Sequence, residues 1–236
     1  MKPESHATMQ SIVETRGKAG ATGNGAQSIR DEVRHLWGRL QLQLPQFGND
    51  RLRIAFCSTH PGEGATSVAT NFAIFLGDQG RRTVLIECNL RHPTLADHFG
   101  LPRSPGISEY LDGSARIDQA LRREVTPGLD IVPAGSPPSD VYAALGNEGG
   151  ITRLLEDLGE EHEFMILDVP PLSVAPEAAP IVRATDATLL VVQAHRTRKK
   201  SVEKSIQTFD DLGVPCCGVV LNRVHYDVPP FIDQIF

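Results

Sequence analysis

The sequence predicts an α/β fold of three layers, in which helices cover both faces of a mostly parallel sheet. Short apolar runs alternate with helical segments along most of the chain, and this alternation is typical of parallel sheets with two covered faces. A glycine-rich loop joins one strand to the next helix, and two of the apolar runs end in an acidic residue. The length of 236 residues suits one sizeable domain with a tail.

The N-terminal part of the chain divides near residue 28. Residues 1–27 are rich in glycine, alanine, serine and threonine and offer few side chains to pack, so we expect a disordered tail there. We expect one domain over 28–236. It opens with an amphipathic helix that ends before Pro45, because apolar residues recur at three- and four-residue steps: Ile29, Val33, Leu36, Leu40 and Leu44.

The remaining predicted elements follow in the order strand, loop, helix. Apolar runs predict strands over 53–58, 83–87, 164–168, 187–192 and 218–221. Between them, apolar positions at helical spacing predict helices over 67–79, 175–183 and 198–212. Gly80 ends the first of these helices, and two prolines after Asp168 end the third strand.

Composition excludes several classes of function. The net charge of -6 and the pI of about 5.7 argue against general nucleic-acid binding, which needs a broad basic face. No apolar run approaches the roughly 20 residues that cross a bilayer, and the polar N-terminus has no signal core. We therefore expect a cytoplasmic protein. The four cysteines lack paired metal-ligand spacing, which favours buried, reduced thiols over metal or redox use.

A loop at residues 61–67 has the frame of a phosphate-binding site. Its sequence is Pro61-Gly62-Glu63-Gly64-Ala65-Thr66-Ser67. In such a loop, backbone N–H groups and the helix N-terminus face a polyphosphate. Thr66 keeps the hydroxyl that would join a magnesium shell, whereas Ala65 stands where these loops carry a lysine. For the glycines alone, a purely structural turn is an equal alternative.

Polar side chains follow two other strands. Glu87 ends its strand and is a candidate metal ligand and catalytic group, although a lone strand-end carboxylate is more often only solvated. Arg91 is a candidate partner for phosphate or for a nearby carboxylate. Asp168 ends the strand 164–168 as a Walker B aspartate does, and we expect it to contact magnesium directly or through water, on the opposite side from Thr66. A turn-forming role for Asp168 is the alternative.

The chain resembles the bacterial tyrosine kinases of capsule and exopolysaccharide assembly, which are relatives of the deviant-Walker ATPases. The resemblance covers residues 28–225 and rests on six ordered motifs: Ser58–Thr66 leading into Ala69–Ala73; Val84–Arg91 with Pro93 and Phe99-Gly100; Gly106-Ile107 with Tyr110–Gly113; Val132–Gly135 with Pro137; Asp168–Pro171; and Gly218–Asn222. It implies a P-loop NTPase-like fold, ATP or ADP with Mg²⁺ as cofactor, and a place for Asn222 near the purine base. It also implies that the helix at Asp31–Arg34 joins neighbouring subunits into a ring.

Departures from that family point to impaired catalysis. Ala65 replaces the lysine, and Glu87 and Asn89 replace two aspartates on the second acidic strand; asparagine cannot act as a carboxylate base. Trp37 falls where a second arginine is expected in the subunit-joining helix. The C-terminal tail holds one tyrosine, Tyr226, where active members carry a cluster.

Any substitute for the loop lysine has to come from a distant part of the chain. There is no lysine between Lys18 and Lys199. One basic cluster follows a strand and would face either the phosphates or a partner subunit: Arg196, Arg198, Lys199, Lys200 and Lys204. A solvated helix start is the simpler interpretation of this cluster.

Three functions fit these observations. We favour a pseudokinase-like protein that acts with the cytoplasmic segment of a membrane polysaccharide co-polymerase of the Wzz-like type, as a homo- or hetero-oligomer at the inner face of the membrane. The first alternative is an active tyrosine autokinase that uses ATP and magnesium, with Tyr226 as acceptor. The second is a positioning-type ATPase that dimerises with ATP.

Overall fold

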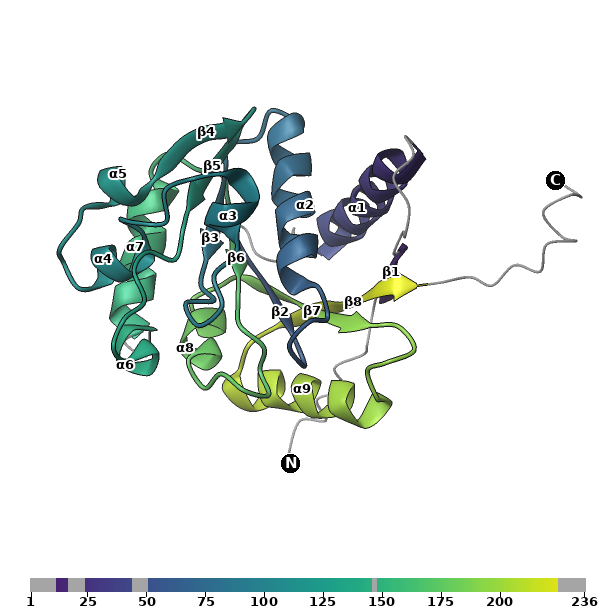
Figure 1. The fold of residues 1–236 in the computed structure, drawn as a ribbon. Coiled ribbons are helices and arrows are strands. Elements are labelled where there is room, and N and C mark those ends of the chain that lie inside the picture. Colours follow the sequence, from purple (N-terminus) through teal and green to yellow (C-terminus); the bar gives the residue numbers. More distant parts are fainter. Residues whose placement is uncertain (1–11, 17–23, 44–50, 146–147, 225–236) are drawn as a thin grey trace, which may run out of the picture.

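The protein forms one mostly parallel sheet with helices on both faces, as the sequence predicts (Figure 1). The computed structural model describes residues 12–16, 24–43, 51–145 and 148–224. The eight strands lie in the order β1-β8-β7-β2-β6-β3-β5-β4, and β4–β5 is the one antiparallel pair among them. The strands are β1 Ile12–Arg16, β2 Leu52–Ser58, β3 Thr83–Glu87, β4 Arg122–Thr126, β5 Leu129–Val132, β6 Phe164–Asp168, β7 Ala187–Gln193 and β8 Cys216–Val224.

Nine helices are described, and the longer ones form the outer layers. They are α1 Asn24–Gln43, α2 Ala65–Asp78, α3 Leu95–Phe99, α4 Ile107–Leu111, α5 Ile117–Ala120, α6 Val141–Leu145, α7 Glu148–Gly159, α8 Ala178–Arg183 and α9 Lys199–Leu212. Helices α1 and α2 pack on one face of the sheet, and α7, α8 and α9 pack on the other (Figure 1). None of the described helices has the length and apolar character needed to cross a membrane.

The central strands are buried on both faces, which explains their continuous apolar sequence. Every residue of β3 and of β6 is buried, so each strand contributes side chains to two separate cores. One core lies under α1 and α2, and the other under α7, α8 and α9. The sheet is therefore the rigid middle layer from which the loops at its carboxyl edge project.

Trp37 attaches α1 to the sheet. Its ring lies edge-on to Phe72 of α2 at 6.1 Å between ring centroids and to Phe164 of β6 at 5.4 Å. Aromatic pairs in this geometry contribute to stability beyond the area that they bury. The tryptophan that departs from the family pattern is thus a packing residue between α1, α2 and β6.

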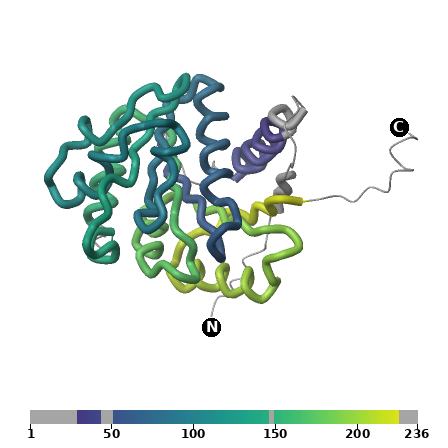
Figure 2. Tube along the Cα trace, in the orientation of Figure 1, coloured from purple at the N-terminus to yellow at the C-terminus, as the bar shows by residue number. Residues whose placement is uncertain are grey.

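The N-terminal segment differs from the expected tail. Residues 12–16 form β1, which pairs in parallel with the edge strand β8, and α1 begins at Asn24, before the predicted boundary at residue 28. In the tube of Figure 2, α1 and β8 lie toward the same end of the sheet. The rest of residues 1–27, together with Tyr226 and the C-terminal tail, lies outside the described residues.

The connection between β3 and β6 contains a carboxylate that organises two loops. Glu109 of α4 accepts hydrogen bonds from the Ser104 hydroxyl (2.7 Å) and from the amides of Gly106 (2.7 Å) and Ser136 (3.0 Å). Partial burial alone would raise the pKa of Glu109, but these hydrogen bonds outweigh it and lower the pKa to about 2. Glu109 therefore fixes the start of α4 against the segment that follows β5.

The four cysteines are free thiols in the structure. Cys57, Cys88 and Cys217 are buried and Cys216 is partly exposed. Burial raises the pKa of the Cys57 and Cys88 thiols above its usual value, which keeps them protonated and unreactive.

Candidate functional site

The phosphate loop lies at the carboxyl end of β2, in the middle of the sheet. β2 pairs with β6 on one side and with β7 on the other, so the loop is surrounded by the ends of three strands. The loop leads directly into α2, which begins at Ala65 with Gly64 as its N-cap. Ligands of open α/β sheets bind outside the carboxyl ends of the strands, and this loop occupies such a place.

Gly64 is required at its position for two reasons. Its φ angle of 95° lies in the left-handed region, which side chains disfavour. A Cβ atom there would also lie 2.2 Å from the Asn222 Nδ2 atom of β8. The same Nδ2 donates a 2.9 Å hydrogen bond to the Glu63 carbonyl. The structure thus brings Asn222 against the loop, and the expected place of Asn222 near a purine base stays a prediction.

The first turn of α2 offers free backbone donors. Within the described residues, the amides of Ala65, Thr66 and Ser67 have no acceptor, and Val68 is the first to bond, to the Gly64 carbonyl at 3.0 Å. Such orphan N–H groups at a helix N-terminus are suited to an anion. Ala65, only 7% exposed, contributes no charge. The cradle of a phosphate loop is therefore present without its cation.

Thr66 and Asp168 are in direct contact. The Thr66 hydroxyl donates a 2.8 Å hydrogen bond to Asp168 Oδ2, so the two expected magnesium ligands lie next to each other. Burial is the largest influence on Asp168 and raises its pKa to about 7, while the Thr66 hydrogen bond opposes this rise and the Glu87 charge adds to it. The side-chain oxygens of Thr66 and Asp168 thus lie next to each other beside the loop.

The carboxylate of Glu87 is engaged by the backbone of two loops. Its carboxylate is 1% exposed and accepts three backbone amides, from Thr94, from Leu95 at 2.7 Å and from Ala134 at 3.2 Å. These bonds hold the start of α3 and the segment after β5 against the end of β3. The predicted metal ligand is thus engaged as an anchor for two loops, because the chain after β3 turns back over its carboxylate.

Arg91 pairs with a carboxylate, the second of its two expected partners. Its Nε and Nη2 atoms contact the two carboxylate oxygens of Glu177 at 2.5 and 3.1 Å, and Glu177 is fully buried. The hydrogen bonds that Arg91 donates to Glu177 and the negative charge of Glu177 raise the pKa of Arg91. This bidentate pair joins the loop after β3 to α8. Glu177 carries no local sequence signal, because it lies 86 residues from Arg91 along the chain.

Glu63 ties the phosphate loop to the turn after β7. Its buried carboxylate accepts the His60 amide at 2.9 Å and the Thr197 hydroxyl. Pro61 and Gly62, which precede Glu63, and Ser67, which follows Thr66, are exposed. The predicted loop residues thus divide into a buried anchor, Glu63, and an exposed rim around the free amides.

Within the described ranges, no group of three or more His, Cys, Asp and Glu side chains is arranged to hold a metal ion alone. Magnesium usually takes one or two carboxylates and completes its shell with water and substrate phosphates. Thr66 and Asp168 fit that requirement, whereas Glu87 and Arg91 are committed to other contacts.

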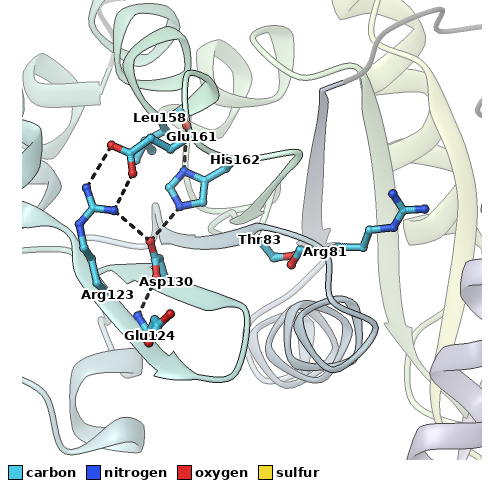
Figure 3. Close-up of polar contacts among 8 residues, drawn as sticks. All are labelled: Arg81, Thr83, Arg123, Glu124, Asp130, Leu158, Glu161 and His162. Carbon is cyan, nitrogen blue, oxygen red and sulfur yellow. Dashed lines mark hydrogen bonds and ion pairs between the residues drawn. The ribbon is translucent and has the colours of Figure 1, made fainter.

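A second polar cluster lies at the opposite, amino-terminal edge of the sheet, beside the first residues of β3 and β5. The Oδ2 atom of Asp130 lies 3.0 Å from His162 Nε2, and Arg123 contacts Glu161 at 2.6 Å and Asp130 at 3.8 Å (Figure 3). Burial alone would raise the pKa of Asp130, but His162, the Glu124 amide and Arg123 outweigh it and lower the pKa. The cluster lines a cavity of about 490 Å³. Because Arg123 contacts both carboxylates and joins β4 to β5, we assign the cluster to stabilising these two strands.

Comparison with known proteins gives the family. Residues 53–210 match the family model described as cellulose biosynthesis protein BcsQ. The tyrosine-protein kinase CpsD of Streptococcus agalactiae is 29% identical over 187 residues, which cover 79% of this chain and 80% of that relative. A putative tyrosine-protein kinase in the cps region of Klebsiella pneumoniae is 29% identical over 205 residues, which cover 86% of this chain but 28% of the relative.

Solved structures agree with this assignment. The VpsO kinase domain superposes with a TM-score of 0.71 at 28% identity, covering 83% of this chain and 98% of that one. The BceF tyrosine kinase domain gives a TM-score of 0.74 at 25% identity, with 85% and 78% covered. The septum site-determining protein MinD of Pyrococcus horikoshii, complexed with Mg-ADP, shares the fold with a TM-score of 0.64 at 20% identity, with 78% and 76% covered. The chain therefore belongs to the family described as cellulose biosynthesis protein BcsQ, and it is a P-loop NTPase-like relative of the bacterial tyrosine kinases.

Proposed function

We propose that this protein binds a magnesium nucleotide at the loop 61–67, transfers phosphate poorly or not at all, and serves in exopolysaccharide or capsule biosynthesis and export with a membrane polysaccharide co-polymerase. One observation carries the proposal. The loop keeps its free amides and its Thr66–Asp168 contact, while buried Ala65 stands at the position of the lysine. The features that hold a nucleotide remain, and one that drives transfer is missing.

The residues present fit ATP or ADP with magnesium. The amides of Ala65, Thr66 and Ser67 would receive phosphate oxygens, and Gly64 leaves room for close approach. Thr66 and Asp168 supply hard oxygen ligands of the kind that magnesium prefers. When bound, magnesium would neutralise phosphate charge. Asn222, held against the loop by its bond to Glu63, would lie near the base.

We expect the absence of the loop lysine to impair nucleotide binding less than phosphate transfer. Loss of one charged donor to a bound phosphate costs about 1.5–3 kcal/mol of binding, which a site with several backbone donors tolerates. Loss of one preorganised donor costs on the order of 10²–10³ in rate in comparable sites. Asn89 adds to the loss because it offers no carboxylate, and Glu87 already accepts three amides. Both effects support a protein that senses nucleotide more than it uses it.

The biological setting follows from the relatives. One of them is a putative kinase in the cps region, and the matching family model describes a cellulose biosynthesis protein. These names support a role in the export of a polysaccharide. We propose an oligomeric protein docked on the cytoplasmic segment of a membrane co-polymerase, which would regulate assembly through nucleotide occupancy.

Phosphorylation of the purified protein tests the proposal. We expect wild-type protein incubated with labelled ATP and magnesium to incorporate little phosphate on tyrosine, and Ala65→Lys combined with Asn89→Asp to incorporate more. Asp168→Asn in the restored background is the matched control and should remove the gain. Rapid self-phosphorylation by the wild type would contradict the proposal and favour an active autokinase.

A further inference from the structure

The phosphate loop has no cation of its own, but two arginines lie at the neighbouring strand ends. Arg196 follows β7, and Arg223 is near the end of β8. One Nη1 atom of each guanidinium contacts the same oxygen, Oε1 of Gln193, at 3.4 Å. Both side chains are exposed. Two positive charges therefore converge on one neutral amide oxygen.

Neither charge is neutralised within the part of the chain that the structure describes. No carboxylate forms an ion pair with Arg196 or Arg223 there, whereas Arg91 and Arg123 each bind a carboxylate with two nitrogens. Contacts of 3.4 Å are at the long limit of a hydrogen bond. An anion that replaced the Gln193 oxygen would therefore cost the two arginines only weak hydrogen bonds.

The arginine pair is attached to the phosphate loop by two routes. Gln193 pairs in register with Asn222, and the Asn222 side chain bonds to the Glu63 carbonyl at 2.9 Å. The backbone N–H of Gln193 also donates to the Thr197 hydroxyl at 3.0 Å, and that hydroxyl donates to the Glu63 carboxylate. The loop and the pair are thus linked at the carboxyl edge of adjacent strands.

The backbone is unusual at Arg223 and next to Arg196. Arg223 itself and His195, next to Arg196, have φ angles of 59°. Non-glycine residues adopt this left-handed conformation at a cost, and they do so where the surrounding structure holds them. At Arg223 the conformation sets the direction in which the side chain leaves the strand end, and at His195 it shapes the turn that leads into Arg196.

We propose that Arg196 and Arg223 form a phosphate-binding pair that supplies the positive charge absent at Ala65, with Gln193 as the residue that positions both guanidiniums. Guanidinium groups bind phosphate oxygens through two parallel N–H donors. This inference rests on the proposed function, because it requires a nucleotide at the loop. It selects two arginines from outside the loop as the replacement for its lysine.

The test compares the affinities of Arg196→Gln, Arg223→Gln and the wild type for ATP, inorganic tripolyphosphate and adenosine. Arg198→Gln is the matched control, since Arg198 is exposed two residues after Arg196, at the start of α9, and makes no described contact with Gln193. Each of the first two variants should lose roughly ten- to a hundredfold in affinity for ATP and tripolyphosphate. Adenosine affinity and the control should stay within about twofold of wild type. In an Ala65→Lys background the losses should shrink.

The outcomes separate this inference from the proposed function. If the wild type binds ATP and both arginine variants bind ATP and tripolyphosphate equally well, the pair is not a phosphate site and the inference fails alone. Equal losses for adenosine and ATP would also overturn it, because the arginines would then serve the base. If wild-type protein binds neither ATP nor tripolyphosphate, the proposed function fails first. Circular dichroism of each variant confirms that a loss does not come from unfolding.

Discussion

Replacing Glu87 with glutamine separates an anchoring role from a metal-binding one. The Glu87 carboxylate accepts amides from Thr94 and Leu95 on one oxygen and from Ala134 on the other. The side-chain oxygen of a glutamine can still accept the hydrogen bonds on one side of the carboxylate. Its NH₂ group would then face a backbone N–H donor on the other side, and that hydrogen bond would be lost. Losing a hydrogen bond to a charged group costs about 1.5–3 kcal/mol, and a buried donor left without a partner costs about 1–3 kcal/mol.

The loss of the Glu87 charge also has a stabilising effect, which is smaller than the loss of these hydrogen bonds. It removes the repulsion between Glu87 and Asp168, which is the last of the causes that raise the Asp168 pKa. We therefore expect Glu87→Gln to lower the free energy of unfolding by about 2–4 kcal/mol, and Tm by roughly 4–16 °C for a domain of this size.

Urea unfolding in the presence of EDTA measures the effect without metal. Trp37 is the one tryptophan of the chain and lies between α1 and the sheet, so its fluorescence reports the transition. Glu203→Gln is the matched control, because Glu203 is exposed and pairs only with Lys199 among the described residues; its change should stay below about 0.5 kcal/mol. If Glu87→Gln in EDTA changes the free energy of unfolding as little as this control does, the anchoring role is refuted.

Three further predictions follow from the packing, the loop and the acid titration. Trp37→Ala should destabilise the protein by about 3 kcal/mol in urea unfolding followed by circular dichroism, the low end for an aromatic residue because Trp37 is only partly buried. Leu42→Ala, at an 83% exposed position, should change little; equal effects would contradict the packing role of Trp37. Gly64→Ala should cost about 1–3 kcal/mol from its left-handed backbone, and adding Asn222→Ala should recover only the part that comes from the clash; full recovery would mean that the backbone is unstrained. Because the folded pKa of Glu109 is lowered to about 2, its contribution is present above pH 4.5 and is lost as the pH falls toward 2. After solvent screening this is about 1–2 kcal/mol, and Glu109→Gln should flatten that part of the stability curve; an unchanged slope would exclude Glu109 as its source.

The central sheet could be predicted because its strands carry a strong local signal. β3 and β6 are fully buried runs, and the expected strands over 83–87 and 164–168 have those bounds. The region between them was harder. Its helices α3 to α6 have four or five residues each, which is too short for a helical period to show. The edge strand β1 was missed because a segment with few apolar neighbours gains its order from pairing with β8.

The site shows the same division between local and distant information. The glycines of the loop and the acid at the end of β6 are local features, so the sequence alone is enough to propose Gly64, Thr66 and Asp168 as site residues, and the structure places the three beside one loop. The engagement of Glu87 depends on amides that return to it after the turn, one of them from beyond β5. Glu177 and Thr197 reach their partners from distant segments. Their roles follow from the way the chain folds back at the carboxyl edge of the sheet.

Calorimetric titration of ATP into wild-type protein and Asp168→Asn, with and without magnesium, tests the central claim most directly. The account predicts that the wild type binds ATP, that magnesium strengthens the binding, and that Asp168→Asn removes the gain from magnesium because it removes the carboxylate beside Thr66. An Asp168→Asn variant with the same magnesium-dependent affinity as the wild type, or a wild type that does not bind ATP at all, would contradict it.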